Sequence, residues 1–342
     1  MNLGNRYGSL DPAPPRSTRR AAAARLALLL GGACMPAWQL CAADEYPARP
    51  IHWILGSAAG SSPDLLARVI ANEMAQRLAQ AIVIDNRPGA SGTLATGAVA
   101  KAVPDGYTAG YVTPSFVLNR ALQLPLPFDP DRELEPVIQF GAQPLVLVVA
   151  ADAPWRSLAD LLAEGRTRPS RLSYASTGLG SIFHLAGELL AAQARASFTH
   201  VPYTSGPQAV ADIAAGRVAF MFNAVNAMAP QVEAGRLRAL AVTSLRRSPV
   251  LPDASTLAEQ GLAGIEVSTW GGLVVPQGTP VLAIGTLNRA ANAALASAAV
   301  RQVLLGGGYD IVGGTPQAFR AFLQQELEKW SAVAERAGLT RR

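Results

Sequence analysis

Short apolar runs alternate with helical patterns along most of this chain, and that alternation is typical of an α/β fold. Ile51–Leu55 predicts a buried strand, and Leu65–Leu78 predicts a helix because apolar residues recur there at every fourth position. Those positions are Leu66, Ile70, Met74 and Leu78. Further predicted strands are Ile82–Ile84, Thr108–Val112, Leu145–Val149, Leu172–Ala175, Thr199–Val201, Val218–Phe222 and Leu237–Val242. A last helix is expected to begin at Thr315-Pro316 and to bury one aromatic face in the core.

The size of the chain allows one large or two medium domains. It has 342 residues, of which 50% are hydrophobic and 15% charged, so it can bury a sizeable core. Leu147–Pro154 resembles Leu273–Pro280, and each is an apolar strand leading into a proline-started helix. This echo predicts a chain that leaves one domain, builds a second and returns. The predicted domains are residues 44–146 plus 268–342, and residues 147–267, although chance explains an eight-residue echo almost as well.

The N-terminal segment has the pattern of a secretory signal peptide. Four arginines between Arg16 and Arg25 precede the apolar run Leu26–Trp38, and the segment closes at Cys41–Ala43 with small residues. We therefore predict a cleaved signal peptide at residues 1–43 and a periplasmic location. An uncleaved membrane anchor is the alternative, but glycines and Pro36 interrupt the run, which is short for a span.

Removal of this leader changes what the composition allows. Five of the 29 basic residues and one of the 24 acidic residues lie in it, so the remainder is close to neutral and has no basic stripe for nucleic acid. Cys34 and Cys41 also lie in it, so the mature chain would have no disulfide, thiolate metal site or cysteine nucleophile. A lipid anchor at Cys41 is disfavoured because Trp38–Leu40 precedes it where small residues are required.

Motifs for catalysis are missing from the sequence. It contains no G-x-S-x-G elbow, Walker loop, H-E-x-x-H pair or dinucleotide fingerprint. His52, His184 and His200 stand without partners at metal-ligand spacing, which favours structural roles. We therefore expect no enzyme activity, metal or cofactor. An exported enzyme remains the alternative, and it would need a group with a strongly shifted pKa in the cleft, for which Asp64 is nearest.

Three polar loops that contain glycine connect a predicted strand to a predicted helix. They are residues 56–64, 176–181 and 204–207. In α/β sheets such loops gather at the carboxyl ends of the strands, where unpaired N–H groups at helix N-termini can hold an anion. Each loop alone is explained as well by ordinary helix capping, but three together favour a binding site.

A series of short motifs runs through the chain in a specific order: Tyr46–Ile51, Asp85–Ala90, Pro104–Thr108, Tyr174–Gly178, His184–Leu189, His200–Tyr203, Leu237–Ser244 and Val312–Pro316. Through these motifs the chain resembles, from about Tyr46 to Leu339, the Bug, or tripartite tricarboxylate transporter receptor, family of periplasmic solute-binding proteins. The resemblance implies a two-domain α/β binding protein (type II-like) with crossing hinge strands and a ligand cleft between the domains. It also implies a small carboxylate ligand (dicarboxylate, tricarboxylate, acidic amino acid or aromatic acid) and a membrane permease or signalling partner. We expect a monomer. A receptor for a non-carboxylate solute and an adhesive surface protein are less favoured functions that the sequence leaves open.

The resemblance also implies the ligand contacts, carried over by position. They are Ser57, Ala59, Gly60, Ser61, Asp64, Thr113, Ser115, Ser176, Thr177, Gly178, Ser181, Tyr203, Thr204 and Asn223. The chain departs from the family pattern at Gly56, where proline is common, and at Ser61, where glycine is common. Thr204 replaces a common lysine and Asn223 a common aspartate.

The last departure predicts a monocarboxylate or aromatic acid rather than an amino acid, because no acid at position 223 would pair with an ammonium group. Asp64 stays open as another source of that charge. Arg87 is tempting as a carboxylate clamp, but a role in bracing its turn is favoured. For Trp270, packing at the domain crossing is favoured over stacking on the ligand.

Overall fold

The computed structural model describes residues 46–204, 206–336 and 338–340. The predicted signal peptide at residues 1–43 lies outside these ranges, as do both cysteines. Within them, no helix combines the length and the apolar character that crossing a bilayer requires.

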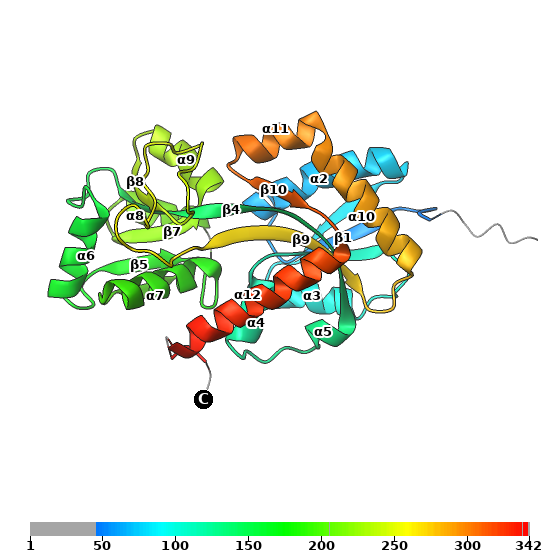
Figure 1. The fold of residues 1–342 in the computed structure, drawn as a ribbon, viewed down its shortest axis with the longest axis horizontal. Coiled ribbons are helices and arrows are strands. Elements are labelled where there is room, and N and C mark those ends of the chain that lie inside the picture. Colours follow the sequence, from blue (N-terminus) through cyan, green and yellow to red (C-terminus); the bar gives the residue numbers. More distant parts are fainter. Residues whose placement is uncertain (1–45, 205, 337, 341–342) are drawn as a thin grey trace, which may run out of the picture. The chain divides into compact units, whose positions relative to one another are not determined.

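The first lobe is a sheet of parallel strands extended by antiparallel ones (Figure 1). Its first elements are β1 (Ile51–Leu55), α2 (Ser62–Leu78), β2 (Ile82–Asn86), the 3₁₀ turn η1 (Ala90–Gly92), α3 (Thr93–Ala100), β3 (Thr108–Val112), α4 (Ser115–Ala121), α5 (Pro130–Glu133) and β4 (Leu134–Ala150). Its last elements are β9 (Ser268–Pro276), α10 (Val281–Ala296), α11 (Ala298–Gly306), β10 (Asp310–Gly313) and α12 (Pro316–Arg336). β1 pairs in parallel with β2 and β3, while β9 runs antiparallel between β3 and β4. The carboxyl ends of β1 and β3 therefore deliver their following loops to one edge of this sheet.

The second lobe repeats this arrangement with the middle of the chain. Its elements are α6 (Leu158–Thr167), β5 (Ser173–Ser176), α7 (Ile182–Ala194), β6 (Thr199–Pro202), α8 (Gly206–Ala214), β7 (Phe220–Ala224), α9 (Val225–Glu233) and β8 (Leu237–Val242). β5 pairs in parallel with β6 and β7, and the end of β4 runs antiparallel to β7 and β8. The loops after β5, β6 and β7 each lead directly into a helix, so a second set of helix N-termini lies at the end of this sheet.

Two long antiparallel strands cross between the lobes. β4 pairs with β9 as far as Pro144, opposite Ser268, and from Leu145 onward it pairs with β7 and β8 instead. At this change of partners the Leu145 N–H donates to Thr243 Oγ1 at 2.9 Å, which ties β4 to the residue that follows β8. Figure 1 shows β4 and β9 running side by side from one lobe to the other. The predicted α/β fold with crossing hinge strands is confirmed.

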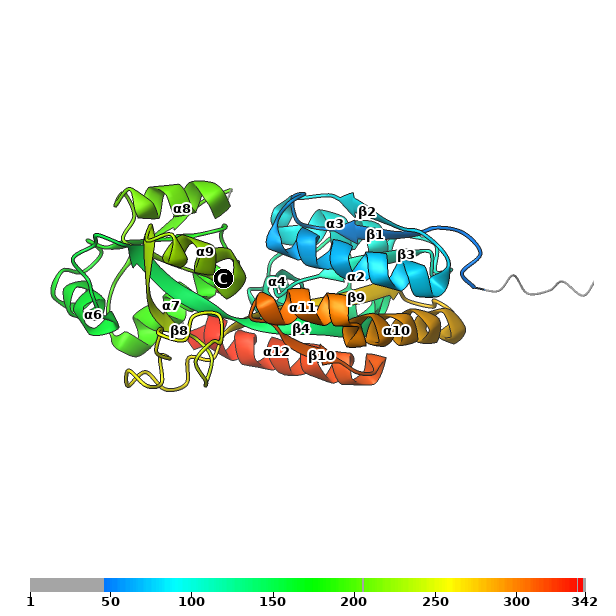
Figure 2. The same ribbon diagram turned by 90° about the horizontal axis from the view of Figure 1, so that it is seen from above.

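The boundaries predicted for the two domains stay a prediction, because the contacts among the residues from Tyr46 onward make one compact unit. Helix α12 contributes to that unity, since it packs on both α4 and β4 and runs alongside the crossing strands (Figures 1 and 2). Its buried side chains Phe319 and Trp330 belong to a core cluster that also contains β5 and α7 residues of the second lobe.

Most predicted elements match the observed ones, and the differences have local causes. Helix α2 buries Leu66, Ile70 and Met74 as its periodicity predicts, but it begins at Ser62, because Pro63 fits the first turn. The prediction Leu145–Val149 covers only the end of β4, since prolines and Gly141 break the apolar run of its first half.

Candidate functional site

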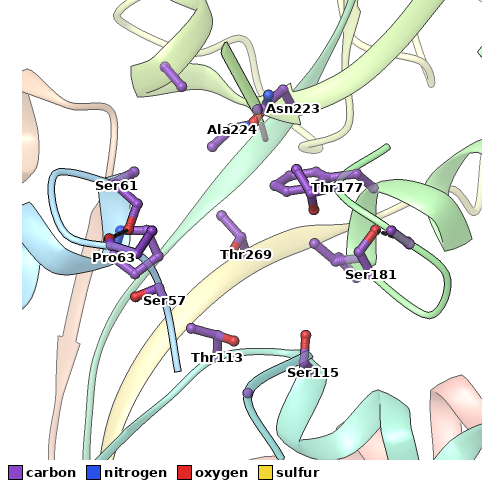
Figure 3. Close-up of a pocket in the computed structure, with 18 of the residues that line it drawn as sticks. Ser57, Ser61, Pro63, Thr113, Ser115, Thr177, Ser181, Asn223, Ala224 and Thr269 are labelled. Carbon is purple, nitrogen blue, oxygen red and sulfur yellow. Dashed lines mark hydrogen bonds between the residues drawn. The ribbon is translucent and has the colours of Figure 1, made fainter. Parts of the chain in front are cut away.

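A cavity of about 1510 Å³ lies between the lobes, with the crossing strands as its floor (Figure 3). The first lobe contributes the loop after β1, the turn before α3, the loop after β3, and Tyr309. The second lobe contributes the loops after β5, β6 and β7 together with residues of α8 and α9. Gln143 comes from β4, and Thr269 and Trp270 come from β9. The cavity is larger than a typical small-molecule site, so a small ligand would leave room for water or for closure of the lobes.

A network of charged and polar side chains holds the loop after β1 on the side away from the cavity. Asp64 is 1% exposed, and it accepts hydrogen bonds from the Gly60 N–H (2.8 Å), from Arg68 Nε (3.0 Å) and from Asn86 Nδ2 (2.9 Å). Asn86 also donates to the carbonyl of Ser57. Burial alone would raise the pKa of Asp64, but the bonds from Arg68, Gly60 and Asn86 outweigh it and hold the pKa below its usual value. Asp64 is therefore an ionised anchor of the loop.

The loop after β5 is braced by neutral groups. Ser176 is fully buried, and its Oγ lies 2.7 Å from His200 Nε2 and accepts from the Gly178 N–H at 3.1 Å. The Gly180 N–H donates to His184 Nδ1 at 3.3 Å. Ser181 caps α7 by accepting from the N–H of His184. These bonds fix the backbone of the loop while leaving its outer residues facing the cavity.

The two imidazoles behind this loop lie against each other, with 4.1 Å between ring centroids, and both are neighbours of the Tyr174 ring. Burial lowers the pKa of His184 to about 4. Burial, and then the nearby His184, lower the pKa of His200 to about 4 as well. Both imidazoles are therefore neutral at pH 7, and they act on the cavity only through the loop that they support.

Twelve of the fourteen predicted contact residues line the cavity. They are Ser57, Ala59, Gly60, Ser61, Thr113, Ser115, Thr177, Gly178, Ser181, Tyr203, Thr204 and Asn223. Figure 3 shows Ser57, Thr113, Thr177 and Asn223 on different sides of one space. That these residues touch a ligand stays a prediction.

Asp64 and Ser176 are placed differently from the prediction. Asp64 is on the helix face that turns toward Arg68 and Asn86, and Ser176 turns toward His200 on the neighbouring strand. Both are buried behind their loops and neither lines the cavity. Arg87 is also away from the cavity wall and pairs with Asp85, with 2.6 Å between Nη2 and Oδ2.

Several wall residues carried no signal in the sequence. Gln143 and Thr269 lie inside strands, and Tyr309 follows α11 far along the chain. Trp270 lines the cavity and also packs on the aromatic rings of α12, with 6.0 Å between its ring centroid and that of Phe319. Trp270 itself was singled out in the sequence, and the two glycines after it leave no room for a side chain, since a Cβ at Gly271 would meet Tyr111 and one at Gly272 would meet Phe319.

The wall of the cavity is almost free of charge. Among its described residues the one ionised side chain is Arg236, which is exposed and lies just before β8. Asn223 accepts from the Ala224 N–H through Oδ1 at 2.8 Å, which leaves its amide NH₂ as a donor. The N–H groups of Ala58, Ala59 and Thr177 have no acceptor within the described part of the chain. The wall thus offers donors to an anion and no described carboxylate that would repel one.

No group of three or more metal-ligating side chains comes together anywhere in the described ranges. His52, for example, is exposed on β1, whereas His184 and His200 are on α7 and β6 of the second lobe. The donors of the wall, backbone N–H groups and hydroxyls, suit an oxyanion rather than a cation.

Comparison with known proteins identifies the relatives of this fold. Residues 66–339 match the model of the tripartite tricarboxylate transporter family receptor. A UPF0065 protein from the tcbD-tcbE intergenic region of Pseudomonas sp. (strain P51) is 40% identical over 291 residues, which cover 85% of this chain and 87% of that protein. Protein BugT of Bordetella pertussis is 37% identical over 298 residues, with 86% and 91% coverage.

The fold also matches solved structures. R. palustris Rpa4515, determined with adipate, superposes with a TM-score of 0.81 at 36% sequence identity, and the match covers 86% of this chain and 99% of that one. The sequence motifs, the crossing strands and these matches agree over nearly all of the described residues. The chain belongs to the tripartite tricarboxylate transporter, or Bug, family of solute-binding receptors.

Proposed function

We propose that this protein is a periplasmic receptor that captures a small organic carboxylate between its lobes, for uptake through a tripartite permease or for sensing. The ligand classes that fit are dicarboxylates, tricarboxylates and aromatic acids. The proposal rests on family membership and on one observation above all, the charge of the cavity wall.

A wall with one cation and no described carboxylate attracts anions of any shape. Arg236 raises the potential at its rim, and the N-termini of α2 and α7 add the positive ends of two helices of 17 and 13 residues. Donors without acceptors at Ala58, Ala59 and Thr177 would complete their hydrogen bonds with a carboxylate. Adipate, a dicarboxylate, occupies the 36% identical relative.

The same wall disfavours an amino acid. An ammonium group needs a carboxylate or several carbonyl acceptors, and Asn223 presents an amide donor where an acid would serve. Asp64, the acid that follows the first binding loop in the sequence, is buried against Arg68 and does not line the cavity. The remaining surface includes Phe116, Phe183 and Met228, which suit an apolar or aromatic body.

The test is thermal unfolding of the protein, refolded first to remove copurified ligand, against adipate, citrate, benzoate and glutamate. A ligand at a hundred times its Kd adds about 2.7 kcal/mol, which raises Tm by several degrees in a chain of this size. We expect a shift with at least one of the first three ligands and none with glutamate.

Asn223→Asp is the matched variant, because it changes one donor to a charge with almost no change of shape. The variant should bind the responding carboxylate about tenfold more weakly or worse, so that its Tm shift becomes smaller, and it should show a Tm shift with glutamate that the wild type lacks. A wild-type protein that is natively refolded and binds glutamate more tightly than every other acid would overturn the proposal.

A further inference from the structure

Four polar side chains from four separate segments of the chain meet at one side of the cavity and join the two lobes. Gln143 of β4 and Asn226 of α9 are bonded twice, through Gln143 Nε2 to Asn226 Oδ1 (3.1 Å) and through the Asn226 N–H to Gln143 Oε1 (3.2 Å). Asn226 Nδ2 then donates to Ser62 Oγ at 2.6 Å, across to the first lobe. Ser62 Oγ lies 3.2 Å from the hydroxyl of Tyr309, just before β10.

This chain of bonds is sheltered from water. Gln143 is 1% exposed and Tyr309 is 8% exposed, while Ser62 and Asn226 are half-buried. Burial is the main cause that raises the pKa of Tyr309, so its hydroxyl keeps its proton at neutral pH. In such surroundings each bond has few competing water molecules, and loss of one partner leaves the other unpaired.

An apolar contact between the lobes lies next to these bonds. Gly308, with φ +74°, has no side chain, and a Cβ there would lie 3.1 Å from Val250 and 3.5 Å from Val225, both in the second lobe. Glycine therefore allows the segment before β10 to approach the start of α9 closely. The two lobes touch here through packing as well as through hydrogen bonds.

We infer that Ser62, Asn226, Gln143 and Tyr309 form a pivot about which the lobes close on the ligand, and that Asn226 is a positioning residue for binding. Asn226 is the informative member because it does not line the cavity, whereas the other three do. Ser62 belongs to the first binding loop, and Asn226 is three residues beyond Asn223. The pivot therefore fixes the separation between one donor set of the first lobe and one of the second.

The inference rests on the proposed function only for its ligand readout, so the primary test uses the protein without ligand. Spin labels are placed at Gln76→Cys in α2 and Ala163→Cys in α6, both exposed, after replacement of Cys34 and Cys41 by serine. The distance distribution between the labels should broaden in Asn226→Ala. The same distribution in Asn226→Ala and in the parent protein would overturn the inference.

Binding of adipate supplies the second readout. We expect Asn226→Ala to weaken it by about three- to tenfold through a faster dissociation rate, because the loss of the net stabilisation of one or two hydrogen bonds has this size. Asn226→Asp should restore the distance distribution, since a carboxylate still accepts from Gln143 and from the Ser62 hydroxyl, while its charge beside the cavity keeps adipate binding weak. If the parent protein does not bind adipate, citrate or benzoate replaces it, and if none of the three binds, the proposed ligand class fails while the distance measurement still decides the pivot.

The matched control is Asn288→Ala. Asn288 also bridges two segments, donating to the carbonyls of Val137 and Gly314, but within the first lobe alone. It should lower stability without broadening the distance distribution. If Asn226→Ala does not fold, Tyr309→Phe removes one hydroxyl from the same pivot, and an unchanged distribution there would equally refute the inference.

Discussion

The two binding loops hold their backbones by different chemistry. In the loop after β1, the Gly60 N–H is bonded to an ionised carboxylate, Asp64, which Arg68 neutralises. In the loop after β5, the Gly180 N–H is bonded to a neutral imidazole, His184, which lies against His200. In both loops a buried side chain of the following helix therefore accepts the hydrogen bond of a glycine N–H. An ionised acceptor (Asp64) and a neutral acceptor (His184) thus hold their loops in a similar way, but the two loops should respond differently to substitution and to pH.

The largest expected effect comes from removing the charged brace. Asp64→Ala leaves the Gly60 N–H and the Asn86 amide without a buried acceptor, and we expect a loss of about 2–4 kcal/mol in the free energy of unfolding. Urea denaturation measures this loss, and calorimetry with the responding carboxylate should show weaker binding.

Asp64→Asn serves as the control for that variant, because its amide oxygen still accepts from Gly60. It should lose less than half as much stability. Equal losses in both variants would mean that the charge, rather than the acceptor for the loop, stabilises this part of the molecule.

When the pH is lowered, the loop after β5 should become less stable at a higher pH than the loop after β1 does. The pKa of both His184 and His200 is about 4 in the folded protein, below the ordinary value of 6.5, so the unfolded chain binds more protons between these values. Stability therefore falls as the pH is lowered from about 6.5 to about 4. Asp64 has a pKa below its ordinary value of 3.8, so its contribution persists through that window and is lost only at lower pH.

Hydrogen exchange between pH 7 and pH 4.5 distinguishes the two loops. Amides near the second loop should lose protection, after correction for the intrinsic rate, while those near the first keep it. In a variant with His184→Gln and His200→Gln, the unfolding free energy should change less over this range. Equal loss of protection in both loops of the wild type would break the comparison.

The smallest expected effect concerns the helix caps of the two loops. Ser181 Oγ accepts from the N–H of His184 and caps α7, whereas the Ser61 hydroxyl donates to the carbonyl of Ala58 and makes no cap bond to α2. Ser181→Ala should cost about 1 kcal/mol, and Ser61→Ala about 0.5 kcal/mol or less. Chemical denaturation of the two variants under the same conditions measures the difference, and equal costs would argue against it.

The sequence predicted the fold well because hydrophobic periodicity is a local property. Helix α2 and strand β3 could be read from Leu66, Ile70 and Met74 and from Thr108–Val112 without any knowledge of their neighbours. The full length of β4 could not, because its first half is buried through pairing with β9, more than 120 residues away. The sequence indicated the crossing of the strands only through the weak similarity between Leu147–Pro154 and Leu273–Pro280.

Which residues line the cavity could be predicted in part, and Asp64 and Ser176 do not line it because hydrogen-bond partners hold their side chains behind the loops. Loop residues such as Thr113 and Thr177 follow strand ends, and the edge of the sheet brings them together. Which way a side chain turns depends on its partner, and the sequence does not place His200 beside Ser176. For Asp64 a signal was present, since Arg68 follows four residues later on the same helix face and could have indicated a pair.

The most direct test of the central claim, that a wall of uncharged donors holds a carboxylate, is titration calorimetry of the refolded protein with adipate and with adipamide. The two molecules have the same chain length and nearly the same shape, but adipamide has no charge and carries donors where adipate has acceptors. We expect adipate to bind at least about a hundredfold more tightly, and Arg236→Gln to weaken this binding mainly at low salt. Equal binding of the two molecules, or binding of adipamide alone, would contradict the claim.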